Sequence, residues 1–191
     1  IARHLISIVN AAPQNVCIFF PSYEIRDKLL EMIELSITKK VLVERQGMGK
    51  EEKAAIFDTF VNAASDRGAV LFGVIGGSFD QGVDFPNNIV KAVVIVGLPL
   101  EKPDLVMEAM INYYDAKFKR GWDYAYIFPA VIKAQQAAGR AIRSEKDRAV
   151  VVYMDKRYLW TNYRKCFSPD TKFVVSRDPA SVIKKFFSTE P

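Results

Sequence analysis

Cysteine and histidine are scarce in this chain of 191 residues, which contains two cysteines and one histidine, His4. The two thiols, Cys17 and Cys166, cannot form a disulfide scaffold, a four-cysteine zinc site or a self-contained four-cysteine iron–sulfur cluster. The single imidazole likewise excludes a histidine-rich metal site. No apolar run approaches the roughly 20 residues that a membrane-spanning helix needs, so we expect no membrane segment here.

The remaining composition is that of a globular domain, since 50% of the residues are apolar and 26% are charged. The length suggests one domain, or two at most. Lys and Arg exceed Asp and Glu, giving a net charge of +5, which suits an anionic partner but is common in domains that bind none. The chain begins at Ile1 without methionine and inside a periodic segment, so we expect a fragment of a longer chain.

Short β-branched runs predict the strands of a sheet. Each run is nearly continuous in apolar residues, as in strands covered on both faces: Val16–Phe20, Val41–Val43, Ala69–Ile75, Ala92–Val96 and Ala149–Tyr153. Amphipathic segments alternate with them: Ala2–Asn10, Tyr23–Leu35, Lys50–Ala64, Asp104–Ile142 and Pro179–Phe187. This alternation predicts an α/β fold with a parallel sheet.

We interpret residues 1–191 as one domain with a helical insert at about 103–142 and an aromatic and basic C-terminal tail at about 155–191. Ser22 precedes the second helical segment and is expected to cap it. The last helix, in the tail, is expected to pack against the sheet.

A conventional phosphate loop is absent. The segment Gly47–Lys50 contains a Gly-Lys pair, but the Walker pattern also needs a glycine five residues earlier and a Ser or Thr afterwards, where this chain has Glu44 and Glu51. We therefore interpret this segment as a turn before a helix. No Gly-x-Gly-x-x-Gly pattern follows a predicted strand either, which argues against a dinucleotide site.

A glycine-rich segment, Gly-Gly-Ser-Phe-Asp-Gln-Gly-Val-Asp-Phe at 76–85, follows the predicted strand Ala69–Ile75. Ligands of open α/β sheets bind at the carboxyl ends of strands, and glycines there let the backbone approach a phosphate. Ser78 offers a hydroxyl group, and Asp84 could accept a hydrogen bond from a sugar. From spacing alone, the segment could equally be a turn between two strands.

A second segment, Gln-x-x-Gly-Arg-x-x-Arg at 136–143, carries cationic side chains. If the segment is helical, Gln136, Arg140 and Arg143 share one face, and two arginines can grip phosphate oxygens. Gly139 weakens a helix, which suggests that something approaches the backbone there. On charge alone, a solvated basic helix remains the alternative.

Together these segments carry a resemblance. Residues 136–143 resemble motif VI of superfamily 2 helicases, and residues 76–85 resemble motif V of the XPD/DinG-type iron–sulfur DNA helicases. Phe-Pro-Ser-Tyr at 20–23 is similar to motif IV of that branch, and Asp-Lys-Arg-Tyr at 155–158 is similar to its Asp-x-Arg-aromatic ending. The motifs follow family order and span about Val16–Tyr158. The chain therefore resembles the second RecA-like motor domain, a three-layer parallel sheet with helices on both faces.

The resemblance implies roles for individual residues. Arg140 and Arg143 match the arginines that reach the ATP γ-phosphate, and Gln136 matches the glutamine near the attacking water or phosphate. The other matched positions are Gly82 and Asp84, which face the nucleotide, and Ser22, Tyr23 and Ser78, which contact DNA. Tyr23 could stack on a base if exposed, although a buried aromatic fits the sequence as well.

One position departs from the pattern. Family members often carry Glu before the motif V glycine, where this chain has Gln81. This difference puts in doubt a charged contact from that position to the neighbouring domain.

The resemblance also implies an ATP-dependent DNA helicase of 5′ to 3′ polarity that acts in nucleotide excision repair. ATP and Mg²⁺ would be shared with the first motor domain of the same protein, and a 4Fe–4S cluster would belong to the part outside this chain. The implied partners are single-stranded DNA and regulators of repair or transcription complexes. The implied location is the cytoplasm, or the nucleus in a eukaryote.

Two other functions remain open. The domain could be a non-enzymatic RecA-like module that docks regulatory proteins through its tail or through the helices at 104–130. It could also bind nucleic acid without any link to ATP. The motif VI arginines argue against both, because neither role needs two guanidinium groups on one helical face.

Overall fold

The computed structural model describes residues 1–80, 83–142 and 144–189. Its helices are α1 (Ala2–Ala11), α2 (Tyr23–Ile33), α3 (Lys50–Ala63), α4 (Leu105–Phe118), α5 (Phe128–Ala138), α6 (Thr161–Arg164) and α7 (Pro179–Ser188). Its strands are β1 (Asn15–Phe20), β2 (Lys40–Val43), β3 (Ala69–Val74), β4 (Val90–Val96) and β5 (Val150–Met154). Two 3₁₀ turns, η1 (Glu34–Ser36) and η3 (Lys156–Leu159), and a π-helical turn, η2 (Asp123–Ile127), complete the regular structure of these residues.

The strands form one parallel sheet in the order β2-β3-β1-β4-β5. The central strand β1 pairs with β3 on one side and β4 on the other. Each predicted strand is confirmed, with ends shifted by no more than two residues. Every residue of β1 and β3 is buried, as their continuous apolar runs predict.

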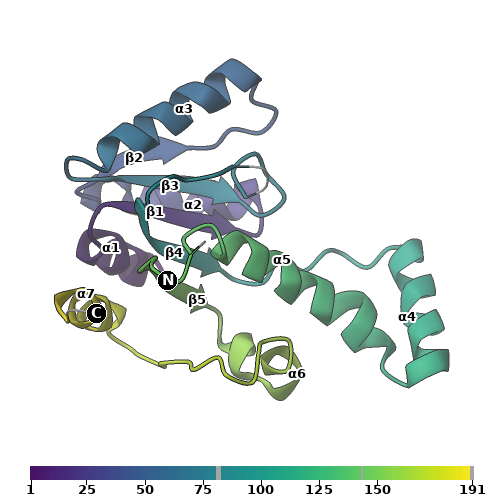
Figure 1. Ribbon diagram of the computed structural model, residues 1–191. Coiled ribbons are helices and arrows are strands. Elements are labelled where there is room, and N and C mark those ends of the chain that lie inside the picture. Colours follow the sequence, from purple (N-terminus) through teal and green to yellow (C-terminus); the bar gives the residue numbers. More distant parts are fainter. Residues whose placement is uncertain (81–82, 143, 190–191) are drawn as a thin grey trace.

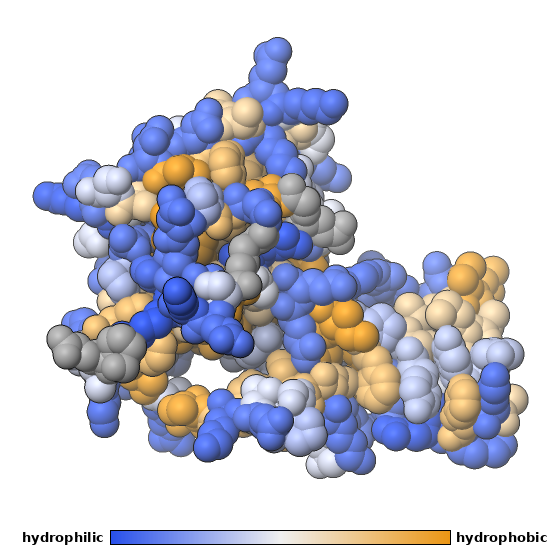
Figure 2. All heavy atoms as spheres, viewed as in Figure 1, coloured by the Kyte–Doolittle hydropathy of each residue, from blue (hydrophilic) through white to orange (hydrophobic). Residues whose placement is uncertain are grey.

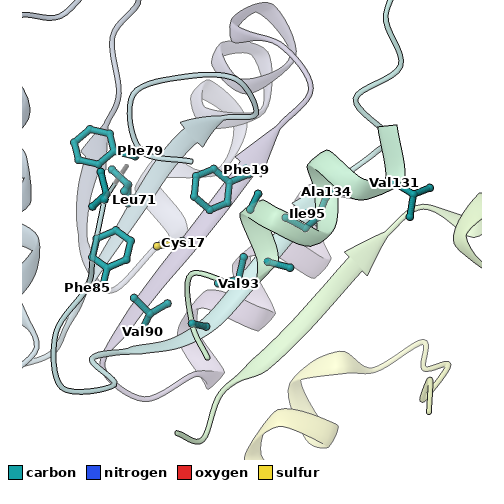
Figure 3. Close-up of a cluster of buried hydrophobic side chains, with 14 of the residues drawn as sticks. Cys17, Phe19, Leu71, Phe79, Phe85, Val90, Val93, Ile95, Val131 and Ala134 are labelled. Carbon is teal, nitrogen blue, oxygen red and sulfur yellow. The ribbon is translucent and has the colours of Figure 1, made fainter. Parts of the chain in front are cut away.

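Helices cover both faces of this sheet (Figure 1). Side chains alternate along β1, so Cys17 and Phe19 join one hydrophobic cluster while Ile18 and Phe20 join the other. The first cluster includes residues of α3 and α5, and Figure 3 shows Cys17, Phe19, Val131 and Ala134 within it. The second includes residues of α1, α2 and α7. The predicted α/β class with three layers is therefore confirmed.

Two helices agree with specific expectations from the sequence, one in its cap and the other in its packing. The Ser22 hydroxyl accepts a hydrogen bond from the Ile25 N–H at 3.3 Å, which confirms Ser22 as the cap of α2. The last helix, α7, lies beside α1 and buries Ile183 in the second cluster. It therefore extends the helical layer over that face of the sheet.

Within the insert between β4 and β5, α5 packs against the sheet and α4 lies away from it (Figure 1). None of the fourteen described residues of α4 is buried. Its exposed large apolar side chains are Leu105, Val106, Met110, Tyr113 and Phe118, and Figure 2 shows apolar side chains gathered at this end of the molecule. Within the described ranges, no helix combines the length and the apolarity needed to cross a membrane.

A buried asparagine joins the amino ends of β1 and β3 to the last turn of α3. Asn15, at the start of β1, is fully buried. Its Nδ2 donates to the Phe60 carbonyl of α3 at 2.6 Å, and its Oδ1 accepts from the Ala69 N–H of β3 at 2.8 Å. Both backbone groups would be left without a partner if this side chain were apolar.

We therefore predict that Asn15→Leu lowers the free energy of unfolding by about 2 kcal/mol, because two buried backbone groups lose their hydrogen bonds. Urea denaturation of the chain measures this change. The control is Asn62→Ala, on the exposed side of α3, which should change the free energy by less than about 0.5 kcal/mol. Equal stability of the two variants would contradict the role of Asn15.

Candidate functional site

Residues that follow three of the strands lie together at the edge formed by the carboxyl ends of the parallel strands. Ser22 and Tyr23 follow β1, Glu44 follows β2, and the loop 75–80 follows β3. Because parallel strands end at the same edge, these segments lie together where open α/β sheets bind ligands.

Glu44 is the centre of the hydrogen bonds at this edge. Its side chain is fully buried. Its Oε1 accepts from the Tyr23 hydroxyl at 3.1 Å and from the Ser78 N–H, while Oε2 accepts from the Val74 N–H at 3.2 Å. Its backbone carbonyl accepts from the Arg26 guanidinium of α2. One carboxylate therefore joins α2, β3 and the loop after β3.

The loop 75–80 donates backbone hydrogen bonds to two buried carboxylates, those of Glu44 and Asp80. Gly76 has φ of +84°, which favours glycine, and its N–H donates to Asp80 Oδ2 at 2.5 Å. A Cβ at Gly77 would overlap Glu44 Oε1. The backbone amides of Gly76 and Ser78 are thus occupied by the chain's own acids. Glycine at 77 is explained by Glu44, and needs no phosphate to account for it.

Asp80 is one of two side chains here with an unsatisfied buried atom. It is 4% exposed, and among the described residues its Oδ1 has no hydrogen-bond partner. Burial raises the pKa of its carboxyl group above the usual range, while the Gly76 N–H and the charge of Arg140 oppose this rise.

The predicted contacts of Ser22 and Tyr23 are only partly available to a ligand. The Ser22 oxygen caps α2. Tyr23 is half-buried, with the Arg26 guanidinium 4.8 Å from its ring centroid. Burial, reinforced by the charge of Glu44 and the hydrogen bond to it, raises the pKa of Tyr23 to about 12. The hydroxyl end of Tyr23 thus belongs to the Glu44 cluster, and base stacking would be confined to the exposed part of the ring.

Arg140 contacts the chain that follows the glycine-rich loop. Its Nη1 donates to the Val83 carbonyl at 3.1 Å, and Asn88 Nδ2 donates to the neighbouring Ala141 carbonyl at 3.2 Å. The buried Nε of Arg140 finds no hydrogen-bond acceptor in the described ranges. The structure thus brings the motif V and motif VI segments together, with one guanidinium donor left over.

The prediction that Gln136 and Arg140 share one helical face is wrong, and Arg143, the third residue of that prediction, lies outside the described residues. Helix α5 ends at Ala138, and Gly139 is its C-cap. Arg140 therefore lies in the turn after the helix, where its N–H bonds to the Ala137 carbonyl at 3.3 Å. Gln136 remains on α5 with an exposed side chain.

Gly139 is not required by the packing of this chain. A Cβ there would meet only the Gln135 and Gln136 carbonyl oxygens, both at 3.5 Å, which is ordinary contact. Its φ is −63°, a helical value that any residue adopts. Any close approach to this backbone must therefore come from outside the described residues.

The remaining predicted positions divide into two groups. Asp84 is exposed and Ser78 is half-buried. Gly82 and Arg143, together with the departure at Gln81, lie outside the described residues.

No metal site emerges from the part of the chain that the structure describes, where no three His, Cys, Asp or Glu side chains gather suitably. Cys17 lies in β1, and burial raises the pKa of its thiol. Two cysteines, one of them buried in β1, do not fit a four-cysteine iron–sulfur cluster.

Sequence reasoning missed Glu44 and Asp80. Glu44 comes directly after the apolar run Val41–Val43. An acid directly after an apolar strand, at the carboxyl end of a parallel sheet, is a signal that could have identified it.

Comparisons with known proteins agree with these motifs. Residues 5–172 match the family described as the helicase C-terminal domain. The chain is 32% identical over 175 residues to the ATP-dependent DNA helicase XPD of Sulfolobus acidocaldarius, covering 87% of this chain and 30% of that protein. It is 29% identical over 174 residues to the ATP-dependent DNA helicase chl-1 of Caenorhabditis elegans, covering 88% and 21%.

A solved structure of an XPD helicase is similar with a TM-score of 0.66 at 30% identity, covering 86% of this chain and 29% of that one. The chain thus spans between about a fifth and a third of the length of these relatives.

We predict that Gly77→Ala destabilises the domain by about 2 kcal/mol or more, because the new methyl group displaces the Glu44 carboxylate. Gly139→Ala is the matched control. It should leave the domain as stable as before or slightly more stable, because a Cβ at 139 makes only ordinary contacts and alanine has a higher helix propensity than glycine. Chemical denaturation of both variants measures the difference. A Gly77→Ala variant with unchanged stability would show that the loop is not packed against Glu44.

Proposed function

Because this chain belongs to the helicase C-terminal domain family and is an XPD-type superfamily 2 member with a RecA-like fold, we propose that it is the second motor domain of an ATP-dependent DNA helicase. In this proposal, ATP binds between this domain and a first motor domain of the same protein. The first domain supplies the phosphate loop and the Mg²⁺ ligands. This chain supplies cationic and polar side chains from the edge described above.

The observation that carries the proposal is the environment of Arg140. Its Nη1 is anchored to Val83, whereas its buried Nε has no acceptor among the described residues. A γ-phosphate oxygen is an acceptor of the right charge for this guanidinium group once the side chain turns from its buried position towards the cleft. The glycine at 139, which this chain's packing does not require, leaves room for a close neighbour.

Arg140 then acts as an arginine finger. Its guanidinium neutralises the charge that spreads over the phosphoryl oxygens in the transition state. Arg143 joins it, and Gln136 lies near the attacking water or the phosphate. Gly82 and Asp84 face the nucleotide from motif V. When hydrolysis removes the γ-phosphate that both domains hold, the cleft between them opens.

Single-stranded DNA lies along Ser22, Tyr23 and Ser78 in this proposal. These side chains contact the phosphate backbone or stack on a base, so binding is independent of sequence and weakens with salt. Opening and closing of the cleft moves the strand by a small step. We also propose 5′ to 3′ polarity and a role in nucleotide excision repair, in the cytoplasm or the nucleus. Regulators of repair or transcription complexes are the proposed protein partners. A 4Fe–4S cluster would lie outside this chain.

A docking module is the second candidate function, and α4 favours it. None of the fourteen described residues of this helix is buried, although many are apolar. A regulatory protein could cover them. Full ATP hydrolysis by an Arg140→Ala protein that still binds its regulator would support this function over catalysis.

We predict that the purified 191-residue chain alone hydrolyses no measurable ATP, because it holds only one side of the site. A phosphate-release assay with and without single-stranded DNA checks this. Turnover by the isolated chain would contradict a shared site.

In the full-length protein, we predict that Arg140→Ala lowers ATP hydrolysis by roughly a thousandfold or more, as expected for loss of an arginine finger. Affinity for single-stranded DNA should fall only modestly. Lys146→Ala, which removes an exposed positive charge nearby, is the control and should leave hydrolysis unchanged. Equal losses of hydrolysis and DNA affinity in Arg140→Ala would instead indicate a structural role.

A further inference from the structure

The Glu44 side chain bonds to two segments that carry proposed DNA contacts, Tyr23 and Ser78, and the second of these segments leads on to the nucleotide-facing residues of motif V. Tyr23 stands at the start of α2, on the proposed DNA track. Ser78 and Val74 belong to the loop and strand that lead to the nucleotide-facing residues of motif V. These partners lie 21, 34 and 30 residues from Glu44 in sequence. These residues reach the same carboxylate only because the fold brings distant parts of the chain together.

The contact with α2 is a double one. Besides the Tyr23 hydroxyl bond at 3.1 Å, the buried Arg26 guanidinium donates to the Glu44 backbone carbonyl. Arg26 also packs over the Tyr23 ring, 4.8 Å from its centroid. The start of α2 is therefore fixed to Glu44 through two side chains, and cannot shift without disturbing it.

The contact with the loop is equally direct. The Ser78 N–H and the Tyr23 hydroxyl donate to the same oxygen, Oε1. Close packing reinforces this arrangement, because a Cβ at Gly77 would overlap that oxygen and one at Gly73 would lie 3.1 Å from Oε2. A displacement of Tyr23 is thus transmitted to Ser78 through a single shared acceptor.

We propose that Glu44 is a positioning residue that couples the DNA-contacting start of α2 to the motif V loop, so that bound DNA sets the loop for ATP hydrolysis. This inference rests on the proposed function. Glu44 itself is buried and touches neither ligand. Its effect passes through Tyr23 on one side and Ser78 on the other.

Glutamine at position 44 separates coupling from folding. The two side chains have the same shape, but an amide offers one acceptor oxygen and one NH₂ donor group. If its oxygen faces Ser78 and Tyr23, the NH₂ faces the Val74 N–H; if it is turned over, the NH₂ faces the Ser78 N–H. Either orientation leaves one backbone donor unmatched. The neutral amide also weakens the shared contact where its oxygen still faces Tyr23 and Ser78, because the charge-assisted bonds to the carboxylate are lost.

The experiment compares ATP hydrolysis by the full-length protein with and without saturating single-stranded DNA, at saturating ATP. We expect Glu44→Gln to reduce the stimulation by DNA about tenfold or more, while hydrolysis without DNA, the KM for ATP and the Kd for DNA each change less than about threefold. Glu52→Gln is the matched control. That carboxylate pairs with the exposed Arg45 and takes no part in the cluster, so stimulation should be retained.

The other outcomes are decisive. Equal loss of hydrolysis with and without DNA would make Glu44 purely structural and would overturn the inference. Full stimulation in Glu44→Gln, in a protein that Arg140→Ala inactivates, would overturn the inference but keep the proposed function. A full-length protein without DNA-stimulated hydrolysis would refute both.

Tyr23→Phe provides the test if Glu44→Gln does not fold. It removes one donor and leaves the Val74 and Ser78 bonds in place, so stimulation at saturating DNA should fall about threefold. Retention of full stimulation would overturn the inference.

Where both variants fold, the double variant should be no worse than Glu44→Gln alone, because both changes break the same link. Additive losses would contradict it.

Discussion

The Glu44 carboxylate determines the shape of the edge at which the segments of Tyr23 and Ser78 meet. It accepts hydrogen bonds from α2, β3 and the loop after β3, and Asp80 satisfies a further amide of that loop. In phosphate-binding loops a bound anion satisfies such amides. Here the anions are supplied by the chain itself. The loop therefore holds its conformation before any ligand arrives, and the side chains carried by neighbouring segments remain to bind one.

Local sequence patterns predicted the fold, because a buried segment can be recognised from its own run of apolar residues. The all-apolar runs at β1 and β3 mark strands with both faces covered, and Ser22 marks the start of α2. No pattern in the sequence around Glu44 shows its role, since its hydrogen-bond partners lie 21 to 34 residues away. The end of α5 was missed for a different reason. In the sequence, Gly139 suggests a point where something approaches the backbone, and the three- and four-residue spacing of the polar side chains favours continuing the helix beyond it.

Asn15 and Arg140 illustrate two kinds of buried polar group. Asn15 finds partners for both its amide oxygen and its amide nitrogen within the chain, so its role is to hold α3 and β3 to β1. Arg140 keeps a buried Nε without an acceptor among the described residues, beside a glycine that the packing does not need. Unmet hydrogen-bonding capacity of this kind is costly in a purely structural position. It is the property expected of a side chain that completes its contacts with a partner domain or a ligand.

The order of the strands has a consequence for synthesis of the chain. The central strand β1 ends at Phe20, whereas its two neighbours begin at Ala69 and Val90. At ordinary translation rates the apolar run Val16–Phe20 of this strand leaves the ribosome on the order of ten seconds before both edges of the strand can be paired. During that time Val16–Phe20 is the part of the nascent chain best suited to capture by a chaperone, and the part most prone to aggregate without one.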